Sequence, residues 1–63
     1  MTYHATVQRG ERFWLVYVAE LDRWTQARHD GEIELMARDL VATMLEIPAD
    51  SFEMEITHAQ LAG

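Results

Sequence analysis

The stretch Phe13-Trp14-Leu15-Val16-Tyr17-Val18 decides how this chain folds, because consecutive large apolar residues in a 63-residue protein cannot all stay in water. Its β-branched and aromatic residues favour a strand, and Glu20 follows too soon for a buried helix. Alternate side chains of a strand point to opposite faces. One face therefore receives Phe13, Leu15 and Tyr17, and the other receives Trp14, Val16 and Val18.

Both faces of this strand are apolar, whereas the sequence offers a single helix to cover one of them. If the face that carries Tyr17 meets the helix, the other face forms an exposed apolar patch, and such patches usually mark interaction sites. The alternative is that Trp14 packs on the edge of its own sheet or under the C-terminal tail, because half-covered antiparallel sheets are common. We expect an oligomer or partner interface with these residues: Trp14, Val16, Val18 and Trp24.

The length of the chain predicts one domain, residues 1–63, with a small core. A domain of this size buries only ~60% of the surface that it exposes when unfolded. The sequence contains no cysteine and no Cys/His cluster at the spacing of a metal site. Association with another chain is the remaining route to extra stability, so we expect a homo-oligomer.

The charge balance indicates which partners suit the chain. Eleven acidic residues against five basic residues give a net charge of −6, which opposes a phosphate backbone and suits a basic protein. The longest apolar run, Phe13–Ala19, is too short to span a bilayer, and the N-terminus lacks a basic region followed by an apolar stretch. We expect a cytoplasmic protein that contacts neither nucleic acid nor membrane directly.

Three further segments have strand patterns. Residues 2–8 alternate polar and apolar, and Arg9-Gly10-Glu11, with a glycine able to take positive φ, predicts a hairpin to residues 13–18. Residues 23–27 predict a short third strand. Residues 52–57 alternate strictly and predict a fourth strand with Phe52, Met54 and Ile56 inward. The tail, residues 58–63, is expected to fray.

A helix is predicted between the third and fourth strands. It begins near Gly31 with Asp30 as N-cap, and Pro48 ends it. Glu34 stands four residues before Arg38, the favourable order for an ion pair. The inner face is a stripe at helical spacing: Ile33, Met36, Ala37, Leu40, Val41 and Met44.

The order of these elements predicts the topology. A meander of three strands leaves the third parallel to the first, and a right-handed helical crossover returns the fourth strand beside the first. The predicted fold class is α+β, β-β-β-α-β, with a mixed four-stranded sheet in the order 3-2-1-4 and one helix on one face.

This order, together with three motifs, resembles the HicB-like antitoxins over about residues 3 to 56. The motifs are Phe13-Trp14-Leu15-Val16, Glu20-Leu21-Asp22 and Thr25-Gln26-Ala27-Arg28, the last leading into the helix segment 32–40. The resemblance implies a truncated RNase H-like fold. Better-known members follow the second strand with a Pro-rich turn and a Gly-Cys pair, whereas Arg23-Trp24 stands there in this chain and Ala27 stands near the family's glycine. The sequence therefore resembles a divergent branch.

The resemblance also implies a function. Such antitoxins belong to type II toxin–antitoxin systems and neutralise HicA-type toxins, which are small basic ribonucleases. Many members carry a C-terminal DNA-binding module, but no residues remain for one after the fourth strand, so we expect toxin binding without DNA binding. The alternative is an orphan oligomeric protein-interaction module with no toxin and no catalysis.

Catalytic chemistry has little support in the sequence. RNase H-type catalysis needs several carboxylates that converge on two metal ions. Glu11, Glu20 and Asp22 lie near hairpin ends as on a solvated acidic surface, and the histidines are scattered without HExxH spacing. We therefore expect no enzyme, no catalytic, metal or cofactor-binding residues, and no small-molecule substrate. A minimal metal-dependent nuclease using Glu20 or Asp22 is the second alternative.

Overall fold

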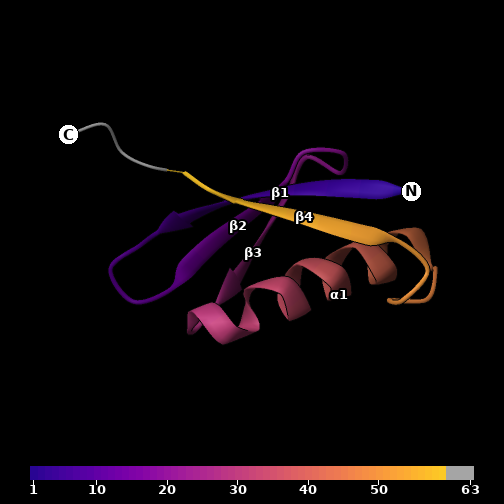
Figure 1. The fold of residues 1–63 in the computed structure, drawn as a ribbon. Helices are drawn as coiled ribbons and strands as arrows, with labels where there is room; N and C mark the ends of the chain where they lie inside the picture. The colour runs from indigo at the N-terminus through magenta and orange to yellow at the C-terminus, as the bar shows by residue number, and fades with distance from the viewer. Residues whose placement is uncertain (60–63) are drawn as a thin grey trace.

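The computed structural model describes residues 1–59, which form four strands, one 3-10 turn and one α-helix (Figure 1). The strands are β1 (Thr2–Arg9), β2 (Trp14–Val18), β3 (Arg23–Ala27) and β4 (Glu53–His58). The helical segment consists of the 3-10 turn η1 (Asp30–Glu32) and the helix α1 (Ile33–Leu45).

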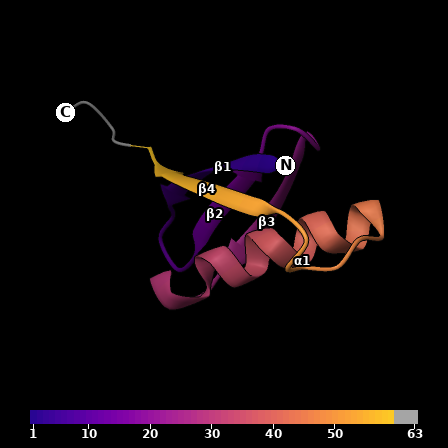
Figure 2. The same cartoon turned by 45° about the vertical axis from the view of Figure 1, so that its right-hand side comes forward.

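The four strands form a single sheet in the order β3-β2-β1-β4, which confirms the predicted topology. β1 pairs with β2 and β2 with β3 in antiparallel fashion, while β4 runs parallel to β1. Figure 2 shows, as does Figure 1, that α1 lies along one side of the sheet. The molecule is thus an α+β fold of two layers, and the second face of the sheet has no covering layer among residues 1–59.

The register of the β1–β2 hairpin determines which face of β2 meets α1. Ala5 pairs with Val18 and Val7 with Val16, and directly paired residues share a face. Val16 and Val18 are both 0% exposed and belong to the core. The prediction that these two residues form an exposed patch is therefore wrong. The core consists of Tyr3, Ala5, Val7, Val16, Val18, Ala27, Ile33, Ala37, Val41 and Phe52.

Trp14 also lies on the helix side of the sheet, half-buried against the core. Its ring meets His58 edge-on with 5.7 Å between ring centroids. The guanidinium of Arg9, its partner on β1, lies 5.6 Å from the Trp14 ring centroid. Trp14 thus packs within its own sheet, close to the alternative considered for it, and the expected place on the uncovered face is wrong.

The inner face of α1 is shorter than its sequence pattern predicts. Ile33, Ala37 and Val41 are buried, and Met36 and Leu40 pack against the core. Met44 is 46% exposed because the last turn extends past the sheet, so its assignment to the inner face is wrong. The predicted ion pair is confirmed, with 2.9 Å between Arg38 Nε and Glu34 Oε2.

Both ends of α1 differ from prediction in how they are stabilised. Asp30 does not cap the helix, because the chain passes through η1 first and neither η1 nor α1 has a side-chain cap. At the other end Glu46 adopts φ 56°, and the amide of Ile47 donates to the Ala42 carbonyl at 3.1 Å. This is the long bond of a Schellman motif. The helix therefore ends before Pro48 acts on it.

The hairpin turn needs Gly10 for space rather than for backbone conformation. Gly10 does not have positive φ. Its amide donates to the Phe13 carbonyl at 2.8 Å, and a Cβ at Gly10 would lie only 2.9 Å from that oxygen. In the β2–β3 turn, Asp22 takes φ 51°, a conformation that aspartate tolerates better than most residues.

The C-terminal strand faces inward as predicted. Phe52 is buried and meets Tyr3 edge-on at 5.3 Å between centroids, and Met54 and Ile56 pack against the core. The predicted fraying from His58 onward is wrong for the first residues, since His58 ends β4 and the Ala59 amide donates to the Val7 carbonyl at 2.8 Å. Residues 60–63 of the predicted tail lie outside the described residues. In the described part of the chain, no helix is long and apolar enough to cross a membrane.

Candidate partner-binding surface

The open face is the face of the sheet opposite α1. Alternation along the strands brings every second side chain to it. Its side chains are polar on β1 and β4, whereas β2 and β3 supply apolar and aromatic groups. The members are Thr2, His4, Thr6 and Gln8 from β1, Leu15 and Tyr17 from β2, Trp24 and Gln26 from β3, and Glu53, Glu55 and Thr57 from β4.

The apolar cluster of the open face consists of Leu15, Tyr17 and Trp24. Tyr17 and Trp24 are directly paired across β2 and β3, with 4.8 Å between ring centroids and 45° between ring planes. Trp24 is 56% exposed. It is the one member of the predicted interface set that the structure places on the open face, and whether it contacts a partner stays a prediction.

A hydrogen bond holds the Tyr17 ring in place. Its hydroxyl donates to Asp22 Oδ1 at 2.7 Å. This bond is the main reason why the pKa of Tyr17 is raised above its ordinary value of 10.0, because ionisation would remove the donor beside a carboxylate. The Tyr17 ring of the apolar cluster is therefore held in a fixed orientation.

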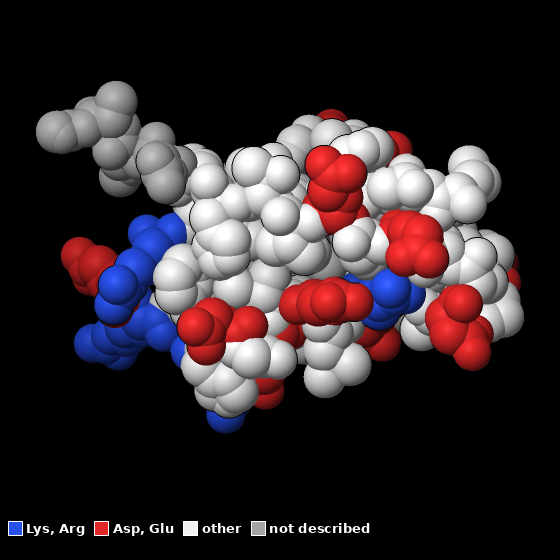
Figure 3. All heavy atoms as spheres, viewed as in Figure 1, with Lys and Arg blue, Asp and Glu red and all other residues white. Residues whose placement is uncertain are grey.

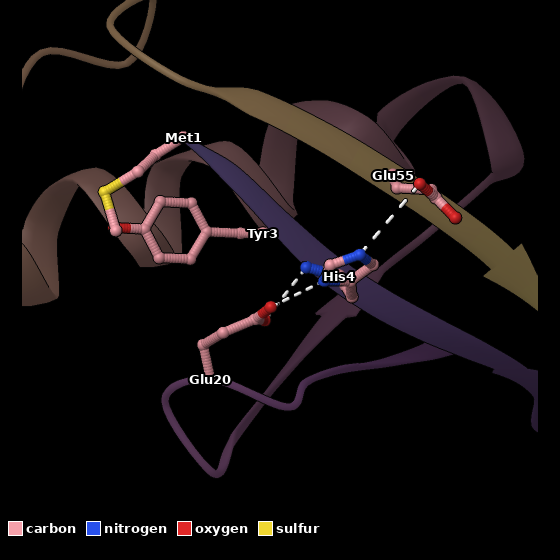
Figure 4. A network of polar contacts seen from close by, with 5 residues as sticks. All are labelled: Met1, Tyr3, His4, Glu20 and Glu55. Atoms are coloured by element: carbon pink, nitrogen blue, oxygen red, sulfur yellow. Dashed lines mark hydrogen bonds and ion pairs between the residues drawn. The ribbon is translucent and has the colours of Figure 1, made fainter.

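An ion pair lies at the β1 side of the open face (Figure 4). His4 Nδ1 is 2.6 Å from Glu20 Oε2, the His4 amide donates to Glu20 Oε1 at 2.9 Å, and Glu55 Oε2 is 4.0 Å from His4 Nε2. The hydrogen bond to Glu20 raises the pKa of His4. Burial would raise the pKa of the Glu20 carboxyl, but the bonds from the His4 ring and amide outweigh it and lower that pKa.

Acidic side chains border the apolar cluster. Glu53 and Glu55 project from β4 on the open face, and Glu20 and Asp22 lie in the turn between β2 and β3. Figure 3 shows acidic groups along β4 and α1, while arginines gather at the end of the β1–β2 hairpin. A cationic partner approaching the β4 side of the open face therefore meets a negative field.

A hollow of about 590 Å³ lies beside β3 and opens widely to solvent. It is lined by Leu15, Trp24, Thr25, Gln26 and Met36. Its volume matches small-molecule sites, but such sites enclose most of their ligand. An open hollow at a sheet edge suits a protruding side chain of a protein partner better.

The carboxylates considered for nuclease chemistry have other partners. Glu20 binds His4 and Asp22 accepts from Tyr17. Within residues 1–59, no three His, Cys, Asp or Glu side chains gather closely enough to hold a metal ion. What this arrangement offers chemically is recognition through aromatic and charged contacts.

The sequence patterns did not assign four residues of the open face and its border to an interface: Leu15, Tyr17, His4 and Glu20. The hydroxyl of Tyr17 was a usable signal, because it fits a half-exposed face better than a core of valines. Neither a scan against protein-family models nor searches of curated proteins and of solved structures find a match to this chain.

Proposed function

We propose that the chain is a HicB-like antitoxin that binds and neutralises a small basic HicA-type ribonuclease in the cytoplasm, without binding DNA itself. The observation that carries the proposal is the open face, where an exposed tryptophan and a fixed tyrosine lie beside acidic side chains. The motifs at residues 13–16, 20–22 and 25–28 support the same assignment through their resemblance to that family.

The apolar cluster supplies the contacts that dominate protein interfaces. Tryptophan and tyrosine bury large areas and lose little side-chain entropy on binding, so they are common energetic anchors. Because Tyr17 is already tied to Asp22, little of its freedom is left to lose. The cluster is thus suited to a stable contact rather than to a passing encounter.

The acidic border selects the kind of partner. A ribonuclease binds the phosphates of RNA through basic side chains, and the net charge of −6 complements such a surface while repelling nucleic acid. Glu53 and Glu55 would occupy basic groups of the toxin that RNA needs. Neutralisation then follows from competition for the same positive surface, and no enzymatic activity of this chain is required.

Growth measurements test the function directly. Any small basic protein encoded beside this one is expressed alone and together with this chain. Toxicity that this chain relieves supports the antitoxin role. A harmless neighbour, or toxicity left unrelieved, favours the alternative of an orphan oligomeric interaction module.

A charge-reversal pair tests the surface. Glu55→Lys reverses an exposed charge in the open face, whereas Asp39→Lys makes the same change on the exposed side of α1. We expect Glu55→Lys to weaken toxin binding roughly tenfold at low salt and less at high salt. Asp39→Lys should bind like the wild type. Equal effects of the two changes would reject the open face as the toxin site.

A further inference from the structure

The backbone hydrogen bonds of the hairpin fix which groups of each strand point to which neighbour. The Ala19 amide donates to the His4 carbonyl at 3.1 Å, so these facing residues occupy a hydrogen-bonding position of the β1–β2 ladder, although the His4 amide donates to Glu20 instead. Hydrogen-bonded and non-hydrogen-bonded pairs alternate in an antiparallel ladder. Leu15 and Tyr17 therefore direct their backbone groups toward β1, and Val16 between them directs its groups toward β3.

The same alternation continues onto β3 and leaves part of its backbone free. Val16 faces Thr25, so the amide and carbonyl of Thr25 form their hydrogen bonds with β2. The neighbours Trp24 and Gln26 then point their amides and carbonyls away from the sheet. β3 is an edge strand, and no group in residues 1–59 pairs with these backbone atoms.

The free edge is short and closed at both ends. Asp22 leaves strand geometry with φ 51°, and the Arg28 amide already donates to Glu32 Oε1 at 3.1 Å. Only one antiparallel register lets two such edges satisfy every free amide and carbonyl. It places Trp24 opposite Gln26 of a second copy, with Thr25 on the two-fold axis.

Side chains on the open face fit this register. Trp24 of the second copy would lie over Gln26, next to Leu15 on the adjacent strand. That position is the hollow of about 590 Å³ beside β3. Tryptophan is among the residues most enriched at the energetic anchors of interfaces, which lie in well-packed pockets. The exposed ring and the hollow beside it thus complement each other across the two-fold axis.

Charges on the two edges also distinguish β3 from β4. Just beyond the two ends of β3, this register brings Asp22 of one copy toward Arg28 of the other, and symmetry repeats this approach of opposite charges. Two β4 edges would instead bring together the Glu53 and Glu55 side chains of both copies. Like charges directly opposite each other destabilise a strand pair, and charged edge residues commonly block such pairing.

We propose that a second copy of this chain binds along β3, in the antiparallel register with Thr25 on the axis, and joins the two sheets into one. The dimer is argued from the free edge of β3 and from the hollow and charges beside it, and it goes beyond the proposed toxin binding. Its tests use this chain without any toxin, so failure of one proposal leaves the other intact. The joined sheet would present a continuous open face.

Cysteine cross-linking tests the register. The native chain has no cysteine, so Thr25→Cys introduces a single thiol. Facing residues of a non-hydrogen-bonded antiparallel pair have Cα atoms about 4.5 Å apart, within the range that a disulfide spans. We expect mild oxidation to convert Thr25→Cys into a covalent dimer. Thr57→Cys is the control on the other edge strand, β4. Thr57 is exposed, and Glu53 and Ala59, which are spaced from it by steps of two residues, donate their amides to Met1 and Val7, so Thr57 directs its backbone inward as Thr25 does. Thr57→Cys should stay monomeric on a non-reducing gel.

Sedimentation equilibrium tests the dimer itself. We expect the wild type to have twice the chain mass of 7.3 kDa. Gln26→Pro removes an amide that points outward from β3 and that no intrachain bond uses. We expect this variant to have the monomer mass. Circular dichroism shows whether that variant is folded. Trp24→Glu is a second variant that should abolish the dimer, and it does so without removing a backbone amide. Glu55→Lys on the β4 edge should keep the dimer mass. A monomeric wild type, a dimer that survives in both Gln26→Pro and Trp24→Glu, or faster cross-linking at Thr57→Cys would overturn the proposal.

Discussion

The two faces of this sheet are built from the same strands, yet they meet different requirements. The helix side holds Val7, Val16 and Val18 at 1% exposure or less, and no polar side chain of residues 1–59 is buried there. The open face mixes aromatic, amide and charged groups, and two of its titratable groups, His4 and Tyr17, each have a partner within this chain. Folding therefore depends on the helix side, whereas the open face is free to serve recognition.

Aspartate placed on each face in turn should separate these roles most clearly. At Val16 it would bury an unpaired carboxylate, which costs several kcal/mol, and a 63-residue domain has only about 3 to 9 kcal/mol to lose. We expect Val16→Asp to be unfolded at 25 °C and Trp24→Asp to melt cooperatively. Thermal melts followed by circular dichroism at equal chain concentration make the comparison.

The opposite result would show that the faces are assigned wrongly. If Trp24→Asp unfolded the chain while Val16→Asp melted like the wild type, the open face would be the one that folding requires. If Trp24→Asp loses the dimer, its midpoint no longer depends on chain concentration, and the gap below the wild type widens with the logarithm of concentration. Melts at several concentrations therefore separate lost association from lost folding.

Within the helix-side layer, Arg38 joins α1 to the segment before β4. Its Nη1 donates to the carbonyls of Ala49 at 2.6 Å and Phe52 at 2.9 Å, and its guanidinium lies 5.3 Å from the Phe52 ring centroid. Arg38→Ala leaves both carbonyls without this donor, and we expect it to cost about 2 kcal/mol in the free energy of unfolding.

Urea denaturation measures this loss. Arg12→Ala is the matched control, because it deletes the same kind of side chain from the exposed end of the β1–β2 hairpin. We expect the control to change stability by less than about 0.5 kcal/mol. Similar losses in both variants would mean that the clasp adds nothing beyond a general effect of charge.

The sequence predicted the topology because each element has its own pattern. The alternation of residues 2–8 and 52–57, the helical stripe and the handedness of the crossover together lead to one strand order. They do not determine the inward face of β2, since both of its faces are apolar. That choice depends on hairpin register, and a shift of one residue reverses every side chain.

The prediction of the candidate site was limited by the same ambiguity over which face of β2 points inward. Trp24 was predicted with the same ambiguity as Trp14 and lies on the open face, whereas Trp14, Val16 and Val18 were assigned to the wrong face. The His4–Glu20 contact joins residues 16 positions apart and depends on the same register, so no local pattern could reveal it. A hydroxyl within an apolar run, or a carboxylate next to it, is the local indication that one face of that strand is exposed to solvent.

The His4–Glu20 pair should produce the smallest effect, a pH dependence confined to the open face. The pKa of His4 is raised above 6.5, so its contribution to stability is complete below pH 6.5 and is lost as the pH rises through the raised value. The pKa of Glu20 is lowered below 4.5, so its contribution is complete above pH 4.5 and is lost as the pH falls through the lowered value. Both contributions are present together between those limits.

We therefore expect the melting temperature of Glu20→Gln to fall furthest below that of the wild type between about pH 5 and 6, with a smaller difference at about pH 8. Glu53→Gln makes the same change of charge on the open face without a histidine contact, and its difference from the wild type should stay flat over this range. Nuclear magnetic resonance titration of the His4 ring adds a direct readout, because its pKa should drop toward 6.5 in Glu20→Gln. A His4 pKa that is the same in both proteins would mean that the pair seen on the open face does not hold in solution. The open face would then present a neutral, unpaired imidazole to its partner at pH 7.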